Sequence, residues 1–148
     1  VWREELAMPD LPYGAFGENF TITDLEEKTV CLGDIYQVGA AQIQVTQPRL
    51  PCWKLARRWN IKDLTARVQE RGWGGWYHRV VQEGDVEAGT PVQLIERMYP
   101  QYPILKLLVL MYRLIELPVV VADLASLDVL SPSWRETFTR YAAEAGVS

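Results

Sequence analysis

Cys52 has the setting in this chain that best suits chemistry. It stands in the segment Gln47-Pro48-Arg49-Leu50-Pro51-Cys52-Trp53-Lys54. Residues 42–46 alternate apolar and polar side chains, which predicts a half-buried strand, and two prolines then prevent further strand pairing. From Cys52 onward the spacing of apolar residues becomes helical. We therefore expect the thiol where a strand ends and a helix begins.

Four cations crowd the same stretch: Arg49, Lys54, Arg57 and Arg58. A helix N-terminus and nearby cations both favour thiolate over thiol. Cys52 is therefore a candidate nucleophile or soft-metal ligand, and the alternative is a small buried hydrophobic residue. The cations could bind a small anion such as a phosphate group, or they could form a solvated helix face. Because Arg57 and Arg58 are adjacent on the predicted helix, at most one of them is expected to face the site.

Composition narrows the classes of protein that fit. The chain has 148 residues, 49% of them hydrophobic, which suits one domain, or a main domain with a small appendage, and argues against disorder. The net charge of −4 makes nucleic acid an unexpected partner, so the cation cluster indicates a small anionic ligand. Two cysteines and one histidine suit neither a disulfide scaffold nor structural zinc.

The chain termini and the longest apolar run indicate where in the cell the protein is expected. Residues 104–117 form the longest apolar run, but the run contains charges and is too short to span a bilayer. No signal peptide is recognisable, so we expect a reducing cytoplasm and no membrane contact. The chain opens without methionine, and we expect a processed product, a fragment or one piece of a larger protein.

The first hundred residues carry mainly β signals. Short stretches with strand patterns fall at 20–22, 29–38, 42–46, 76–81 and 90–97. A helix interrupts them, with Asn60 as its expected N-cap and Gly72 as its stop. Short strands, frequent glycine turns and few helices are typical of a small barrel or sandwich.

The pattern changes after Tyr99-Pro100. Three helices are predicted at 104–116, 123–129 and 131–145. The last has a typical start, with Ser131 before Pro132. We therefore expect a β domain over residues 1–98 and a three-helix domain over residues 99–148. The apolar helix faces are expected to form a core first and a partner surface second.

Three further motifs could contribute to a site. Asn19, in Gly17-Glu18-Asn19, could offer a donor and an acceptor to a planar heterocycle, or it could cap a turn. Gly33-Asp34 is interpreted as a β-turn or bulge. His78 could transfer protons beside the aromatic residue Trp76, but a lone histidine on a strand is more often structural or exposed.

Taken in order, these motifs resemble the MOSC domain, named for the C-terminal region of molybdenum cofactor sulfurases. The matching segments are 17–20, 30–34, 45–54, 75–77 and 79–80. The resemblance is greatest to bacterial N-hydroxylaminopurine resistance proteins, in which three helices follow the barrel. It implies a mainly β fold with some α structure: a MOSC-type β-barrel over residues 1–98 and a small three-helix domain over 99–148. Such relatives carry further strands ahead of the position of Val1.

The resemblance also implies a function and a site. It implies a molybdenum cofactor (molybdopterin), with Cys52 as metal ligand and catalytic residue and with Asn19, Arg49 and Lys54 holding the cofactor. The implied reaction is reduction of N-hydroxylated bases and related compounds, with electrons from a flavoprotein reductase. Pyridoxal phosphate would be expected only if the chain belonged to a larger sulfurase.

Two alternatives remain beside this function. One is a sulfur carrier that holds a persulfide on Cys52, and the other is a binding module without catalysis. The expected partners also include a second copy of this chain, or an N-terminal segment like the one that helps to build the cofactor pocket in the relatives.

Overall fold

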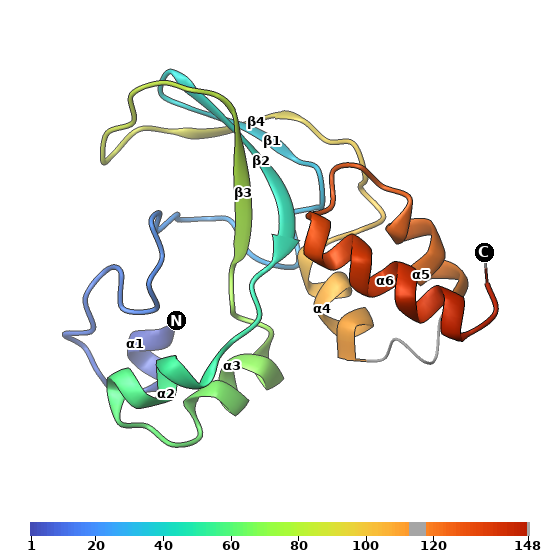
Figure 1. The fold of residues 1–148 in the computed structure, drawn as a ribbon. Coiled ribbons are helices and arrows are strands. Elements are labelled where there is room, and N and C mark those ends of the chain that lie inside the picture. The colour runs from blue at the N-terminus through green and yellow to red at the C-terminus, as the bar shows by residue number, and fades with distance from the viewer. Residues whose placement is uncertain (113–117, 148) are drawn as a thin grey trace.

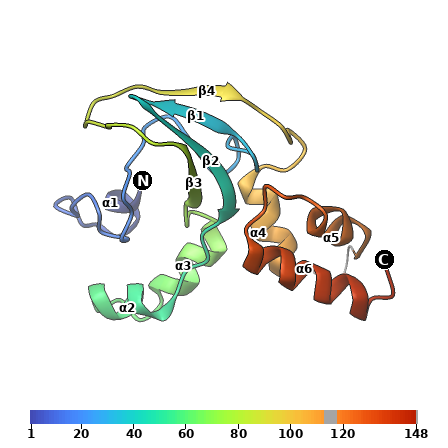
Figure 2. The same cartoon turned by 45° about the horizontal axis from the view of Figure 1, so that its top comes forward.

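The computed structural model describes residues 1–112 and 118–147, which form one antiparallel sheet with helices grouped on two sides below it (Figures 1 and 2). The sheet contains β1 (Ile35–Val38), β2 (Ala41–Pro48), β3 (Trp76–Gln82) and β4 (Val92–Glu96), in the order β3-β2-β1-β4. One helical group holds α1 (Trp2–Glu5), α2 (Trp53–Trp59) and α3 (Leu64–Arg71). The other holds α4 (Ile104–Tyr112), α5 (Pro118–Ala125) and α6 (Pro132–Glu144).

The centre of the sheet is a hairpin between β1 and β2. Val38 lies opposite Ala41, so the turn consists of Gly39 and Ala40. Gly39 has a φ of +60°, and a Cβ atom there would lie 2.6 Å from the carbonyl oxygen of Asp85. The hairpin therefore requires glycine at this position, because a side chain would be both strained and crowded.

The predicted closed β-barrel is wrong for the part of the chain that the structure describes. The outer strands β3 and β4 do not pair with each other, and the predicted strand at 20–22 is irregular. Small closed barrels use about five to eight strands, whereas this sheet has four. The fold is therefore mixed α/β, and the small helical part after β4 is consistent with the prediction.

The helix predictions are partly confirmed. Helix α6 has Ser131 as its N-cap, and the Ser131 hydroxyl accepts a hydrogen bond from the backbone N–H of Trp134 at 3.4 Å. Asn60 does not begin a helix: it ends α2 in a left-handed conformation, and Asp63 is the N-cap of α3. Helix α5 begins and ends earlier than the predicted 123–129. The end of the predicted helix 104–116 lies outside the described residues.

Two hydrophobic cores hold these elements. The larger lies between the sheet and helices α4–α6, and includes Tyr36 and Val45 from the sheet and Leu107 and Phe138 from the helices. The smaller joins α2 and α3 through Leu55, Leu64 and Val68, with Trp2, Phe16 and Trp59 packed on it. The division of the chain at residue 98 stays a prediction, and the larger core takes residues from both sides of it.

A buried carboxylate ties the start of β1 to the end of β4. Asp34 is 0% exposed and accepts hydrogen bonds from the Nε and Nη2 atoms of Arg97 at 2.9 and 2.7 Å. It also accepts from the backbone N–H of Cys31 at 2.9 Å and from the Tyr36 hydroxyl at 3.1 Å. Gly33 has a φ of +77°, so the predicted turn is present. The hydrogen-bond network around Asp34 was not predicted.

None of the helices formed by the described residues is both long enough and apolar enough to cross a membrane.

Candidate functional site

Cys52 lies at the predicted junction between strand and helix. Strand β2 ends at Pro48, and Cys52 is the N-cap of α2 with extended backbone angles. Its carbonyl oxygen accepts from the backbone N–H of Leu55 at 3.1 Å and from the Thr65 hydroxyl at 3.2 Å. Its thiol makes no capping hydrogen bond and is exposed. The sulfur atom is therefore accessible on a backbone that is held in place.

Arg49 joins three segments that are distant in sequence. Its guanidinium donates to the carbonyl oxygen of Phe16, and its backbone N–H donates to the carbonyl oxygen of Gly75 at 2.9 Å. A Cβ atom on Gly74 would lie 2.5 Å from the carbonyl oxygen of Arg49. Glycine at position 74 thus allows the strand that leads into β3 to approach the segment before Cys52 closely.

The Glu18 carboxylate shapes the glycine-rich loop that precedes Asn19. It accepts backbone hydrogen bonds from Gly14 at 2.8 Å and Phe16 at 2.9 Å, and one from the Thr21 hydroxyl at 3.3 Å. Asn19 follows this loop and is exposed. The loop is thus held by a side chain of the predicted motif itself.

A cavity of about 520 Å³ lies between this loop and β3. Its aromatic lining residues are Trp2, Phe16, Phe20, Trp73, Trp76 and Tyr77. Its polar lining residues are Glu18, Asn19, Thr21, Glu27, Arg49 and His78. Volumes of 300–1,000 Å³ with apolar walls and a few polar groups are typical of small-molecule sites.

The cavity brings together only some of the predicted site residues. Asn19 and Arg49 both line it, whereas Cys52 and Lys54 are not among its lining residues. Lys54 is exposed on α2. Chain geometry nevertheless limits the separation of the Arg49 and Cys52 Cα atoms to about 11 Å, at most about 3.6 Å for each residue. A ligand of moderate size in the cavity could therefore reach toward the thiol.

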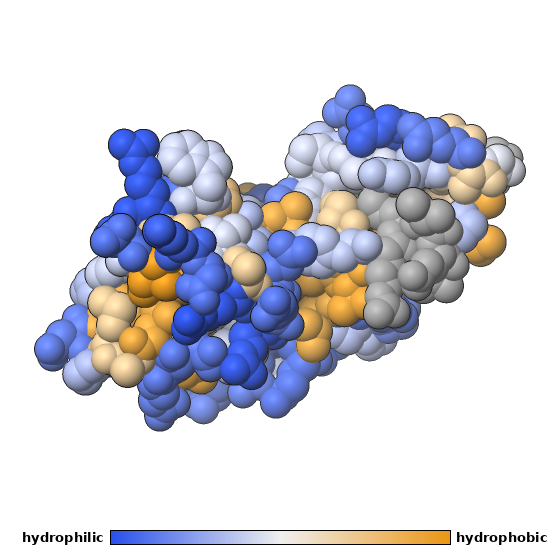
Figure 3. All heavy atoms as spheres, turned by 90° about the horizontal axis from the view of Figure 1, so that it is seen from below, coloured by the Kyte–Doolittle hydropathy of each residue, from blue (hydrophilic) through white to orange (hydrophobic). Residues whose placement is uncertain are grey.

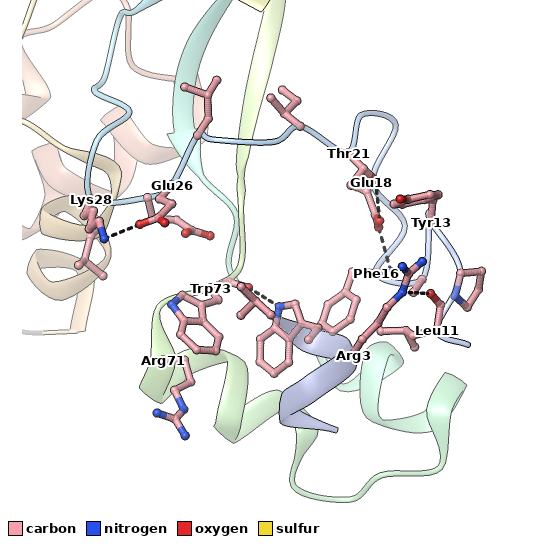
Figure 4. A pocket seen from close by; sticks show the side chains of 18 residues that line it. Arg3, Leu11, Tyr13, Phe16, Glu18, Thr21, Glu26, Lys28, Arg71 and Trp73 are labelled. Atoms are coloured by element: carbon pink, nitrogen blue, oxygen red, sulfur yellow. Dashed lines mark hydrogen bonds and ion pairs between the residues drawn. The ribbon is translucent and has the colours of Figure 1, made fainter. Parts of the chain in front are cut away.

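A second hollow of about 630 Å³ shares several lining residues with the first (Figure 4). Glu26 and Lys28 lie on one side of it, Arg3 and Glu18 on the other, and Trp73 between them. The Trp2 indole N–H donates to the carbonyl oxygen of Trp73 at 3.3 Å. This contact joins two residues that line both hollows.

Glu27 is a cavity residue that sequence reasoning missed. Its Oε1 atom accepts from the backbone N–H of Gly75 at 2.9 Å, and it lines both hollows. Burial raises the pKa of this carboxyl group above its ordinary value. In sequence, Glu26-Glu27-Lys28 is typical of an exposed charged turn, so no local signal separated Glu27 from its neighbours.

His78 is held neutral beside the same cavity. Its Nε2 atom accepts from the Trp76 indole N–H at 3.0 Å, and burial lowers its pKa from 6.5 to about 4. The unfolded chain therefore binds a proton in the range from pH 6.5 to 4 that the folded chain does not bind. His78 thus contributes stability above pH 6.5 that is lost as the pH falls toward 4, in total about 3 kcal/mol.

We expect replacement of His78 with glutamine to remove this pH dependence. Chemical denaturation at pH 7.5 and pH 5 should show wild type losing about 2 kcal/mol more than His78→Gln between the two conditions. Glu27 also makes the folding stability depend on pH, with the opposite sign, because its pKa is raised in the folded state. Its contribution is the same in wild type and in His78→Gln, so it cancels when the two proteins are compared at the same pH values. Equal losses in both proteins would contradict a buried neutral histidine.

The four cations beside Cys52 do not all face the cavity, and whether they bind a small anion stays a prediction. Arg57 lies over the Trp53 ring, 5.8 Å from its centroid, and Arg58 lies over Trp59 at 5.5 Å. Neither arginine is among the residues that line the two hollows. Of the four cations in this stretch, Arg49 is the one that lines the cavity.

The residues fit a cofactor that carries most of its own metal ligands better than a free metal ion. No group of three or more His, Cys, Asp or Glu side chains that could hold an ion occurs within the described residues. Cys52 can supply one soft thiolate ligand. Arg49 and Asn19, with the aromatic walls, suit a planar ligand that carries an anionic group.

A protein-family model for the MOSC domain matches residues 1–93, so the chain belongs to the MOSC domain family. The resemblance found in the sequence is thereby confirmed. The chain is similar to the uncharacterized protein YflK of Bacillus subtilis. The two are 44% identical over 96 residues, which cover 65% of this chain and 43% of YflK. It also matches a protein of Gibberella moniliformis named reductase, with 38% identity over 107 residues, 70% of this chain and 19% of that protein.

The fold agrees with a solved structure of a relative. The crystal structure of YiiM from Geobacillus stearothermophilus matches with a TM-score of 0.90 and 42% sequence identity, over 95% of this chain and 72% of that chain. The present chain spans less than half the length of the curated relatives that it matches.

Proposed function

We propose that this chain is the cofactor-binding part of an oxidoreductase that reduces the N–O bond of N-hydroxylated bases and related compounds. The observation that carries the proposal is the exposed Cys52 thiol three residues after Arg49, which lines an aromatic cavity together with Asn19. Family membership and the relative named reductase support the same class of reaction.

The residues have separate roles in this proposal. The Cys52 sulfur ligates molybdenum, the Arg49 guanidinium binds the anionic group of the pterin, and Asn19 hydrogen-bonds its heterocycle. Lys54, the exposed second residue of α2, adds positive charge near the thiol. When bound, the cofactor supplies the two-electron chemistry. The aromatic walls exclude water from the bound heterocycle.

The overall reaction consumes two electrons and two protons for each N–O bond, and it releases one water and the reduced amine. A flavoprotein reductase is the proposed electron source. Glu27 is the cavity group suited to hold a proton, because its raised pKa keeps its carboxyl protonated to higher pH than an exposed glutamate.

The test is metal and pterin analysis of protein produced in a host that makes molybdenum cofactor. We expect molybdenum and pterin in equal amounts, together with reduction of an N-hydroxylated base by reduced viologen dye. Protein that never carries molybdenum under any expression condition, and that shows no reduction, would overturn the proposal.

One observation favours a second candidate, a sulfur carrier. Cys52 is exposed and lies outside the lining of both hollows, which would suit a persulfide that is passed to an acceptor. Mass spectrometry showing an extra sulfur atom on Cys52 in protein that contains no pterin would support the carrier in place of the reductase.

A further inference from the structure

The segment that begins at Arg49 is the most one-sided in charge in this chain. Residues 49–62 contain five cations and no carboxylate, whereas the chain as a whole has a net charge of −4. Lys54, Arg57, Arg58 and Lys62 are all exposed. None of these four forms an ion pair with a carboxylate of residues 1–112 or 118–147. These cations are not neutralised within the described part of the protein.

An exposed aromatic side chain, Trp53, lies within this cationic segment. Trp53 is 61% exposed, and the Arg57 guanidinium lies 5.8 Å from its ring centroid. The indole is thus largely open to solvent and packs against a cation instead of a core. Tryptophan and arginine are the residue types that most often contribute the binding energy of protein interfaces.

We define the basic helix face as Trp53, Lys54, Arg57 and Arg58 of α2. Helix α2 lies near the lower edge of the molecule in Figure 1, and the view from below shows hydrophilic side chains around smaller hydrophobic areas (Figure 3). Cys52 directly precedes Trp53 and is also exposed. A partner seated on this face would therefore lie beside the thiol.

We propose that the basic helix face is the docking surface for an acidic flavoprotein that delivers electrons to the Cys52 site. The proposal rests on the proposed reductase function, which requires an electron donor. Electron-transfer encounters are typically small and transient, and opposite charge increases their association rate. The unneutralised cations select an acidic surface, and Trp53 supplies the apolar anchor. Nucleic acid is the less suitable partner, because the patch is confined to one short helix of an acidic chain.

The experiment measures binding of reduced flavodoxin, a small acidic flavoprotein, by calorimetry at low and at physiological salt. We expect Lys54→Glu with Arg57→Glu to weaken binding at least about 10-fold, and Trp53→Ala to weaken it about 30-fold. Raising the salt concentration should slow association with wild type. Because these side chains are exposed, their replacement should leave the fold intact.

The matched control is Lys106→Glu with Arg140→Glu. It changes the net charge equally, and each of these cations also lies over an aromatic ring, Lys106 over Tyr102 at 5.3 Å and Arg140 over Tyr141 at 5.5 Å. We expect flavodoxin affinity within twofold of wild type. Equal weakening by both double variants, or no binding by wild type, would overturn the proposal. Binding of a 20-nucleotide single-stranded DNA that depends on α2 and exceeds flavodoxin binding would overturn it as well.

Binding is measured without turnover, so the two proposals can fail separately. Suppose that the protein carries no molybdenum but that its α2 variants still lose flavodoxin binding. The docking proposal would then be supported, and the reductase proposal would be contradicted. Suppose instead that the protein contains molybdenum and binds flavodoxin equally well with and without the α2 cations. The docking proposal would then be contradicted, and the reductase proposal would stand.

Discussion

Replacing Cys52 with serine should reduce the reduction of N-hydroxylated bases at least about 100-fold. Loss of a group that only orients a metal ligand typically costs 10–100-fold, and loss of the ligand itself should cost at least as much. A hydroxyl is a harder and less acidic ligand than a thiol, so serine does not replace the thiolate. The measurement is the rate of substrate reduction together with the molybdenum content of the same preparation.

The same substitution should leave the fold intact and strengthen α2. Cys52 is the N-cap of this helix, but its side chain makes no capping hydrogen bond. Serine is a preferred N-cap residue and is typically worth about 1 kcal/mol over a residue that does not cap. Lost activity with equal or higher unfolding free energy would separate chemistry from folding. Undiminished activity in Cys52→Ser would contradict a role for the sulfur atom.

Cys31 provides the matched control. It is the other cysteine, it is buried, and burial raises the pKa of its thiol. We expect Cys31→Ala to keep its molybdenum and its activity. The Cys31 sulfur lies 3.7 Å from the carbonyl oxygen of Pro100, and Cys31 is not among the residues that line either hollow.

Replacing Arg97 with methionine should cost about 3–5 kcal/mol of folding free energy. Arg97 makes two hydrogen bonds to the carboxylate of Asp34, which is 0% exposed. Methionine can fill the space of the aliphatic stem but leaves that carboxylate buried without its charged partner. Chemical denaturation at neutral pH is the measurement, with the slope against denaturant checked for two-state behaviour.

A surface ion pair of the same residue types provides the comparison. Arg135 lies 2.9 Å from a carboxylate oxygen of Asp128, whose side chain is 93% exposed. We expect Arg135→Met to cost less than about 1 kcal/mol, because both charges remain hydrated when separated. If the two variants lost similar amounts of stability, the Asp34 network would not have the importance that its burial indicates.

The local features of the site could be predicted from the sequence, because short-range rules determine them. The alternating stretch and the two prolines predicted a strand that ends before Cys52 and a helix that starts there, and α2 starts as expected. Strand β2 continues two residues beyond the predicted end at 46, because Pro48 still lies opposite Trp76 at the outer end of the pairing with β3. Ser131 before Pro132 likewise predicted the start of α6. These signals act over a few residues and need no knowledge of the rest of the chain.

Features that depend on distant partners could not be predicted. Asp34 and Arg97 are 63 residues apart, and nothing near Gly33-Asp34 distinguishes a buried charge network from an ordinary turn. Glu27 reaches Gly75 across 48 residues in the same way. The strand pattern suggested a barrel or a sandwich, and the resemblance to the MOSC domain implied the barrel. Closure depends on which strands pair, and β3 does not pair with β4. Whether Cys52, Asn19, Arg49 and Lys54 hold a cofactor stays a prediction.

The two outer strands also affect how this polypeptide should behave at high concentration. Val80 and Val81 of β3 and Leu94 and Ile95 of β4 are each more than 40% exposed, along strands whose outer backbone groups have no neighbouring strand among the described residues. Such borders can template the addition of further extended segments, which is the first step of fibril growth. Preparations of the isolated polypeptide should therefore be kept dilute. If the protein aggregates when it is concentrated, we expect the aggregation to begin at these edge strands while the hydrophobic core stays folded.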